Sequence, residues 1–325
     1  MFQDVQSFSF LGLTVYKYGL TLAAAAAAWL FLSGLLAKKK NISVNTVLLT
    51  DVLAIPMGLF FARLLYCLVS LEQFLETFGL PVAMLYFWDG GFSMMGALLG
   101  VSLAALITAR IKKVSYGDLM DVLAGSAGLF LAIARLGEAY TTLGRGKSIS
   151  IEWMQKSTFF STREVWGDFH AVFRYEAVVA AVLLAVMLCL FFGKKTRATA
   201  RPGDLALVFG TLFGSAQVVL ESLRDDGHML WGFVRASQII SALLPVAAVV
   251  VFSVQLIRRE DVGRKLIASW LLAAAGIGFA IIKEFDIDTS NNLFRDYALM
   301  SIAMAVLASS ALYLWREAKN KRHRI

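Results

Sequence analysis

Long apolar segments constrain this chain more than any other feature of its sequence. A helix that crosses a membrane needs about 20 consecutive apolar residues, because the hydrocarbon core of the bilayer is about 30 Å thick. Hydrophobic residues make up 58% of the 325 residues, compared with about 45–50% in soluble domains. We therefore predict an all-α fold, a polytopic bundle of membrane helices. The predicted spans are 13–37, 46–70, 93–110, 117–136, 174–192, 204–222, 236–257, 266–283 and 297–315.

Clusters of Lys and Arg follow every second predicted span, at 38–40, 110–113, 194–201, 258–265 and 316–324. Cytoplasmic loops of membrane proteins carry an excess of these residues. We therefore expect the clusters to face the cytoplasm, with the N-terminus outside and the C-terminus inside. This distribution explains the net charge of +8, so no nucleic-acid partner is expected.

The sequence offers no pattern typical of disulfides or metal sites. Cys67 and Cys189 both fall inside apolar spans, and His170, His228 and His323 are far apart in the chain. We expect no metal ion and no cofactor. The first residues lack the charged start and cleavage site of a secretory signal peptide, so no cleaved leader is expected.

Two long loops fall on the predicted outer side. Residues 137–173 interleave aromatic residues such as Trp153 and Trp166 with basic residues such as Lys156. This pattern suits a segment at the level of the lipid headgroups, and a folded cap without a lipid role is the alternative. Residues 284–296 are acidic but lack the spacing of an EF-hand, so we predict a solvated polar loop.

Ionisable residues inside predicted spans are costly and mark candidate functional sites. Arg63, Arg135 and Glu221 lie in spans, and Arg224 follows the end of one. Glu221 and Arg224 are three residues apart and share a helix face. Two interpretations remain open: these residues bind a substrate, or they form structural ion pairs, as Arg135 could with Glu138 or Glu221.

A glycine-rich segment at 87–100 combines turn and helix signals. Gly90 and Gly91 permit unusual backbone angles, and Ser93 is placed to cap the following helix. Gly96 and Gly100 are four residues apart, so they share a face and let a helix or a lipid come close. A tight turn with ordinary packing is the alternative.

Seven short motifs, in order along the chain, resemble those of the bacterial prolipoprotein diacylglyceryl transferases. The resemblance extends from about residue 10 to 257. The matching segments are Tyr16-Lys17-Tyr18-Gly19-Leu20, Phe61-Ala62-Arg63-Leu64-Leu65-Tyr66, Trp88-Asp89-Gly90-Gly91-Phe92-Ser93-x-x-Gly96, Ala132-Ile133-Ala134-Arg135-Leu136-Gly137, His170 with Tyr175-Glu176, Glu221-x-x-Arg224-x-Asp226, and Ala236-Ser237-Gln238-Ile239.

The resemblance implies a seven-span transferase domain at 1–257 with an outer loop at 137–173, followed by a C-terminal helical hairpin and basic tail at 258–325. It implies an enzyme of the bacterial plasma (inner) membrane. The family transfers the diacylglyceryl group of phosphatidylglycerol to the lipobox cysteine of a prolipoprotein signal peptide. A variant transfer to another acceptor and a non-enzymatic paralog that binds phospholipid or signal peptides are the alternatives. A transporter is disfavoured, because no inverted repeat is visible.

The resemblance also assigns candidate roles to individual residues. Those implied in catalysis are Arg135, Glu221, Arg224, Tyr18 and His170. Those implied in substrate binding are Arg63, Trp88, Asp89, Gly90, Gly91, Ser93, Gly96, Gly137, Glu138, Tyr175, Glu176 and Gln238.

Several family positions hold a different residue in this chain. Met95 stands where the family has His, Glu138 where it has Asn, and Gln217 where it has Arg. Because a thioether has no useful basicity, we expect His170 or Glu138 to handle the thiol proton, or the thiolate to form unaided. Arg135 is the predicted main phosphate anchor, because a guanidinium grips two phosphate oxygens at once. Arg224, oriented by Glu221, is the predicted second anchor.

Overall fold

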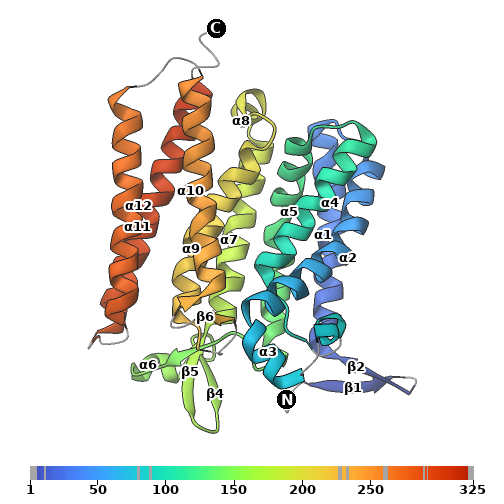
Figure 1. The fold of residues 1–325 in the computed structure, drawn as a ribbon, viewed down its shortest axis with the longest axis vertical. Coiled ribbons are helices and arrows are strands. Elements are labelled where there is room, and N and C mark those ends of the chain that lie inside the picture. The colour runs from blue at the N-terminus through green and yellow to red at the C-terminus, as the bar shows by residue number, and fades with distance from the viewer. Residues whose placement is uncertain are drawn as a thin grey trace.

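A computed structural model describes residues 6–10, 12–78, 81–87, 90–225, 229–231, 234–258, 263–287, 290 and 292–320. In this part of the chain, nine helices are long and apolar enough to cross a membrane, which confirms the predicted all-α bundle (Figure 1). They are α1 (Lys17–Ala37), α2 (Val44–Val69), α4 (Met94–Lys112), α5 (Tyr116–Gly137), α7 (Val172–Phe192), α9 (Asp204–Leu223), α10 (Ala236–Ile257), α11 (Arg264–Ile287) and α12 (Leu293–Asn320).

The short elements decorate the two ends of the bundle. At the end where α1 begins lie the hairpin β1 (Ser7–Phe10) and β2 (Leu13–Tyr16), helix α3 (Leu71–Phe78), and the elements of the 137–173 loop. The short helix α8 (Lys194–Thr199) and the C-terminal end of α12 lie at the other end (Figure 1). The first span thus begins at Lys17, because residues 13–16 pair with β1 instead of continuing the helix.

The 137–173 loop is folded. Its strands β3 (Arg145–Ser148), β4 (Ser161–Glu164) and β5 (Gly167–Ala171) form an antiparallel sheet in the order β3-β5-β4, with the short helix α6 (Glu152–Gln155) beside it. A second small hairpin, β6 (Leu230–Trp231) with β7 (Val234–Arg235), precedes α10. Trp166 is 85% exposed at the β4–β5 turn, so the sheet keeps a large apolar side chain on its surface.

Serine caps begin three of the long helices. The hydroxyl of Ser43 accepts from Thr46 N, that of Ser93 from Gly96 N, and that of Ser115 from Asp118 N, each over 3.2 Å. Each bond satisfies an amide hydrogen that the first helical turn leaves free. The predicted cap at Ser93 is confirmed.

Helices α2 and α4 pack with their backbones in contact. A Cβ atom built on Gly96 would lie 2.3 Å from the carbonyl oxygen of Phe61, and one on Gly100 would lie 2.3 Å from that of Met57. Only glycine permits this approach. The partner that comes close to the two glycines is therefore helix α2.

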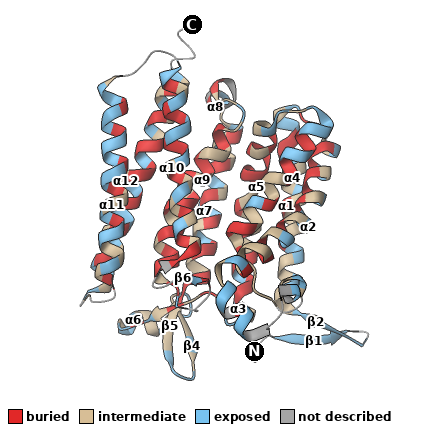
Figure 2. Ribbon diagram, in the orientation of Figure 1, coloured by how far each residue is buried: buried red, intermediate tan, exposed pale blue. Residues whose placement is uncertain are grey.

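Helix α9 belongs to the two larger apolar cores. One joins α1, α2, α4, α5, α7 and α9, and the other joins α9 and α10 to the hairpin α11–α12. Figure 2 shows the buried residues along these helices. The predicted solvated loop at 284–296 is wrong, because α11 continues to Ile287 and α12 begins at Leu293. Asp296 is fully buried and accepts from Lys283 over 3.3 Å. Burial of this charge requires the partners that the paired helices provide.

Candidate functional site

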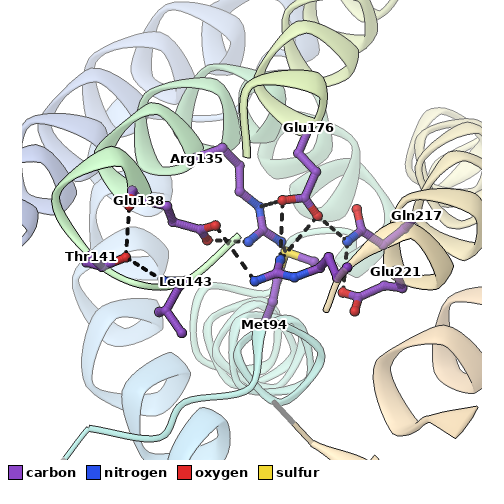
Figure 3. Close-up of polar contacts among 9 residues, drawn as sticks. Met94, Arg135, Glu138, Thr141, Leu143, Glu176, Gln217 and Glu221 are labelled. Atoms are coloured by element: carbon purple, nitrogen blue, oxygen red, sulfur yellow. Dashed lines mark hydrogen bonds and ion pairs between the residues drawn. The ribbon is translucent and has the colours of Figure 1, made fainter. Parts of the chain in front are cut away.

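Charged residues from three helices meet at the end of the bundle that carries the three-stranded sheet. Each member of this ion-pair cluster is no more than 9% exposed, and Figure 3 shows its contacts. The cluster consists of Arg135 at the end of α5, Glu138 directly after it, Glu176 on α7, Gln217 and Glu221 on α9, and Arg224 just beyond α9.

Arg135 lies at the centre of the cluster, and each of its three guanidinium nitrogens contacts a different residue. Nη1 pairs with Glu138 Oε1, Nε lies 3.2 Å from Glu176 Oε2, and Nη2 lies 3.2 Å from the sulfur of Met94 (Figure 3). The side chain therefore joins α5 to α7 and α4. The proposed pair with Glu138 is present, so a structural contribution of Arg135 accompanies any role in binding.

Arg224 approaches the same carboxylates from α9. Its Nη1 lies 3.3 Å from Glu176 Oε2, and its Nη2 lies 3.8 Å from Glu138 Oε2. A backbone bridge pairs Arg224 with Gly146 of β3, and Asp225 N donates to Arg145 O over 2.9 Å. The sheet thus fixes the turn that presents this second guanidinium.

Gln217 completes the contacts between α7 and α9. Its amide nitrogen donates to Glu176 Oε1 over 2.7 Å and to Glu221 Oε1 over 2.9 Å. The cluster therefore combines three carboxylates with two guanidinium groups. This arrangement leaves the side chains with one net negative charge when all five ionisable groups are charged.

Tyr18 and Gly137 bring α1 against the end of α5. A Cβ atom on Gly137 would lie 2.1 Å from Thr21 Oγ1 and 3.3 Å from Tyr18 Cδ2. The absence of a side chain at Gly137 therefore lets α1 place Tyr18 next to the helix turn that carries Arg135 and Glu138.

His170 and Tyr175 form a separate pair at the sheet. His170 Nδ1 lies 3.0 Å from the Tyr175 hydroxyl, which donates to Phe160 O over 2.8 Å. Because that hydroxyl hydrogen is already used, the Nδ1 atom of the neutral ring is the donor. Burial lowers the pKa of His170 below the ordinary histidine value of 6.5. Among the described residues, His170 forms no hydrogen bond with a member of the ion-pair cluster.

Arg63 holds the glycine-rich loop before α4. It donates to Met84 O over 3.2 Å, to Gly90 O, and to Gly91 O over 3.4 Å. Gly91 has φ +71°, and a Cβ atom there would lie 2.3 Å from the Tyr66 ring. Trp88 and Asp89, which were predicted to bind substrate, lie outside the described residues, as does Asp226.

Gln238 contacts the C-terminal hairpin. Its Nε2 donates to Glu284 Oε2 on α11 over 2.8 Å and to Val218 O on α9 over 3.3 Å. The hydroxyl of Tyr297 on α12 donates to Ser222 O over 2.9 Å, next to Glu221. The sequence did not identify Glu284 or Tyr297 as residues near the site. The signal available for Glu284 was its place among the acidic residues that follow the eighth predicted span.

A small cavity of about 70 Å³ lies between the ion-pair cluster and the sheet. Polar residues dominate its wall, and Glu138 of the cluster is among them. The lining includes Glu138, Thr141, Thr142, Arg145, Thr162, Glu164 and Arg174. Guanidinium groups such as those of Arg135 and Arg224 bind anions, and Glu138, which contacts both of them, lines the polar cavity.

A sequence profile of the prolipoprotein diacylglyceryl transferase family matches residues 6–254. The phosphatidylglycerol–prolipoprotein diacylglyceryl transferase of Trichormus variabilis is 30% identical over 242 residues, which cover 70% of this chain and 81% of that protein. The enzyme of that name from Acaryochloris marina is 31% identical over 229 residues, with 70% and 81% covered. The one from Listeria monocytogenes is 27% identical over 242 residues, with 73% and 84% covered.

The matched residues include every member of the ion-pair cluster and the sheet that holds Arg224, whereas α11 and α12 lie beyond them. Since the profile covers well over half of the 325 residues and the relatives align over most of their own length, the chain belongs to the prolipoprotein diacylglyceryl transferase family.

Proposed function

We propose that this protein transfers the diacylglyceryl group of phosphatidylglycerol to the lipobox cysteine of a prolipoprotein and releases glycerol phosphate. The observation that carries the proposal is the meeting of two buried guanidinium groups, Arg135 and Arg224, at one end of a membrane bundle of this family.

The cluster suits the charge changes of this reaction. The thiolate attacks the glyceryl carbon that carries the phosphate ester, a C–S bond forms, and the C–O bond breaks. The electron pair of that bond goes to the departing phosphate, where negative charge accumulates. Arg135 and Arg224 bind the phosphodiester and stabilise this charge by paired N–H···O contacts. The surrounding carboxylates Glu138 and Glu176 hold the guanidinium groups in place.

The proposed setting is the bacterial inner membrane, with the ion-pair cluster on the outer side. Support comes from the basic segments 38–40, 110–113 and 194–201, which follow alternate spans. This orientation places the N-terminus outside and the C-terminus in the cytoplasm. The proposed partners are phosphatidylglycerol and the signal peptide of a prolipoprotein.

The reaction can be tested with purified protein in lipid nanodiscs, phosphatidylglycerol and a lipobox peptide. We expect a mass increase of the peptide by one diacylglyceryl group and stoichiometric release of glycerol phosphate. A peptide with Ser in place of the lipobox Cys is the control and should gain no mass. Binding of both substrates without transfer would favour the non-enzymatic alternative, and rescue of cells depleted of their own transferase would contradict it.

A further inference from the structure

The two carboxylate oxygens of Glu138 differ in their surroundings. Oε1 pairs with Arg135. Oε2 is buried and has no hydrogen-bond partner among the described residues, and its ion-pair contact with Arg224 Nη2 is long, at 3.8 Å. Buried acceptors normally receive a hydrogen bond, so this oxygen is available to accept one from a molecule that enters the site.

The residue that carries this oxygen lines the small polar cavity. Glu138 and Arg145 both line this cavity of about 70 Å³, which is large enough for a thiol group on a short carbon chain. Gly144 keeps the approach to Glu138 open, because a Cβ atom there would lie 2.5 Å from Oε2. Gly144 has φ +72°, which also favours glycine.

The other candidate bases of the site are already engaged. Glu176 receives bonds from Arg224 and Gln217 and pairs with Arg135. Glu221 accepts from Gln217, and His170 is bonded to Tyr175 at the sheet. Met95, at the family's histidine position, is 1% exposed and cannot accept a proton.

We propose that Glu138 is the general base that takes the proton of the acceptor thiol, and that the adjoining cavity receives this thiol. The inference rests on the proposed transferase function. The S–H proton moves to Oε2, the sulfur attacks the glyceryl carbon, and the phosphate leaves with the electron pair of the broken C–O bond. Glu138 then returns its proton to the phosphate monoester or to water, which regenerates the carboxylate.

Oε1 keeps its contact with Arg135 during this step, so base and phosphate anchor remain aligned. The charged and titratable groups around Glu138 come from every neighbouring element. They are Tyr18 of α1, Arg135 of α5, Arg145 of β3, Glu164 of β4, Arg174 and Glu176 of α7, and Arg224 after α9.

The test compares Glu138→Gln with the parent protein at pH 7. General-base catalysis contributes about 10²–10⁴ in rate, so we expect a loss of at least about 100-fold in the rate of transfer to a cysteine peptide. Binding of phosphatidylglycerol vesicles should remain within about twofold. Glu152→Gln is the matched control, because Glu152 is exposed on α6, and it should retain full activity.

Two rescues separate a base from a structural residue. A peptide with selenocysteine needs no base, because a selenol is already ionised at neutral pH, so it should restore most of the lost rate in Glu138→Gln. The activity of this variant with the cysteine peptide should also increase as the pH is raised toward about 8.5, the ordinary pKa of a thiol. If Glu138→Gln does not fold, Glu138→Asp provides the same test. The ratio of its rate with the selenocysteine peptide to its rate with the cysteine peptide should exceed that of the parent.

Full activity of Glu138→Gln, or a loss that selenocysteine does not restore, would overturn the role of Glu138 while leaving the transferase function intact. Failure of the parent protein to transfer lipid to either peptide would overturn the proposed function itself, and the base with it.

Discussion

Gln217 on α9 donates to Glu176 on α7 over 2.7 Å, at the position where the family resemblance implies an arginine. The same amide nitrogen reaches Glu221 over 2.9 Å. Gln217 thus satisfies two carboxylates without adding a charge, and it stabilises the contact between the two helices.

We expect Gln217→Leu to destabilise the protein, because two buried carboxylates lose a donor. The expected cost is about 1–3 kcal/mol, the usual range for an unsatisfied buried group. Thermal unfolding in detergent measures it. Gln155→Leu on α6 is the comparison and should have a smaller effect, since the side-chain amide of Gln155 is half-exposed and donates to the carbonyl oxygen of Ile149 and to no carboxylate among the described residues. Equal melting temperatures for parent and Gln217→Leu would contradict the role of Gln217.

Arg135→Lys tests the guanidinium directly. A lysine ammonium keeps the charge but cannot reach Glu138, Glu176 and Met94 together, and it cannot bind two phosphate oxygens in parallel. We expect a loss of about 10²–10³ in transfer rate, which corresponds to roughly 2–4 kcal/mol of transition-state stabilisation. Melting temperature and phosphatidylglycerol binding should be measured on the same sample. Lower stability with unchanged lipid binding would show that Arg135 is only a structural residue.

The close contact of α2 and α4 predicts a sharp difference between two neighbouring glycines. Gly100→Ala should lower the melting temperature, because the new Cβ atom would meet the carbonyl oxygen of Met57 at 2.3 Å. Gly58→Ala is the matched control on the facing helix, where the nearest atom would be 3.8 Å away. It should be neutral or slightly stabilising, since Ala favours the helix over Gly by about 0.5–1 kcal/mol. Similar effects of both substitutions would contradict this packing.

The C-terminal hairpin should support the site through Tyr297, whose hydroxyl donates to Ser222 O beside Glu221. We expect Tyr297→Phe to lower the transfer rate several-fold, because the end of α9 loses a fixed contact. Ser301→Ala is the control: its hydroxyl bonds within α12, to Tyr297 O. Activity of Tyr297→Phe equal to that of the control would show that the hairpin does not influence the site.

His170 should make the protein sensitive to acid. Burial lowers its pKa from 6.5 in the folded state, so below about pH 6.5 the unfolded chain binds a proton that the folded protein does not. Stability therefore falls with decreasing pH, and His170→Asn should lose less melting temperature between pH 7.5 and 5.5 than the parent. Transfer activity of this variant at pH 7.5 should persist. Loss of activity in a folded His170→Asn would restore the catalytic role that the family resemblance implies.

The sequence by itself determined how many long helices the described residues form, and it placed them to within a few residues at their ends. The seventh helix was predicted at 236–257 and runs from Ala236 to Ile257, and Ser93 caps α4 as expected. These features are local: transfer of an apolar segment into lipid depends on its own residues, and a cap depends on residues within one turn. The strand at 13–16 escaped prediction, because its apolar residues resemble a helix start until β1 pairs with them.

Only the tertiary structure decided which charges meet. Arg135, Glu176 and Arg224 are more than 40 residues apart from one another, and their pairing depends on how α5, α7 and α9 pack. The same packing leaves Glu138 Oε2 without a hydrogen-bond partner among the described residues and pairs His170 of β5 with Tyr175 of α7. The energy of a buried ion pair depends on distance and on the removal of water, both of which are properties of the assembled bundle and not of any single segment.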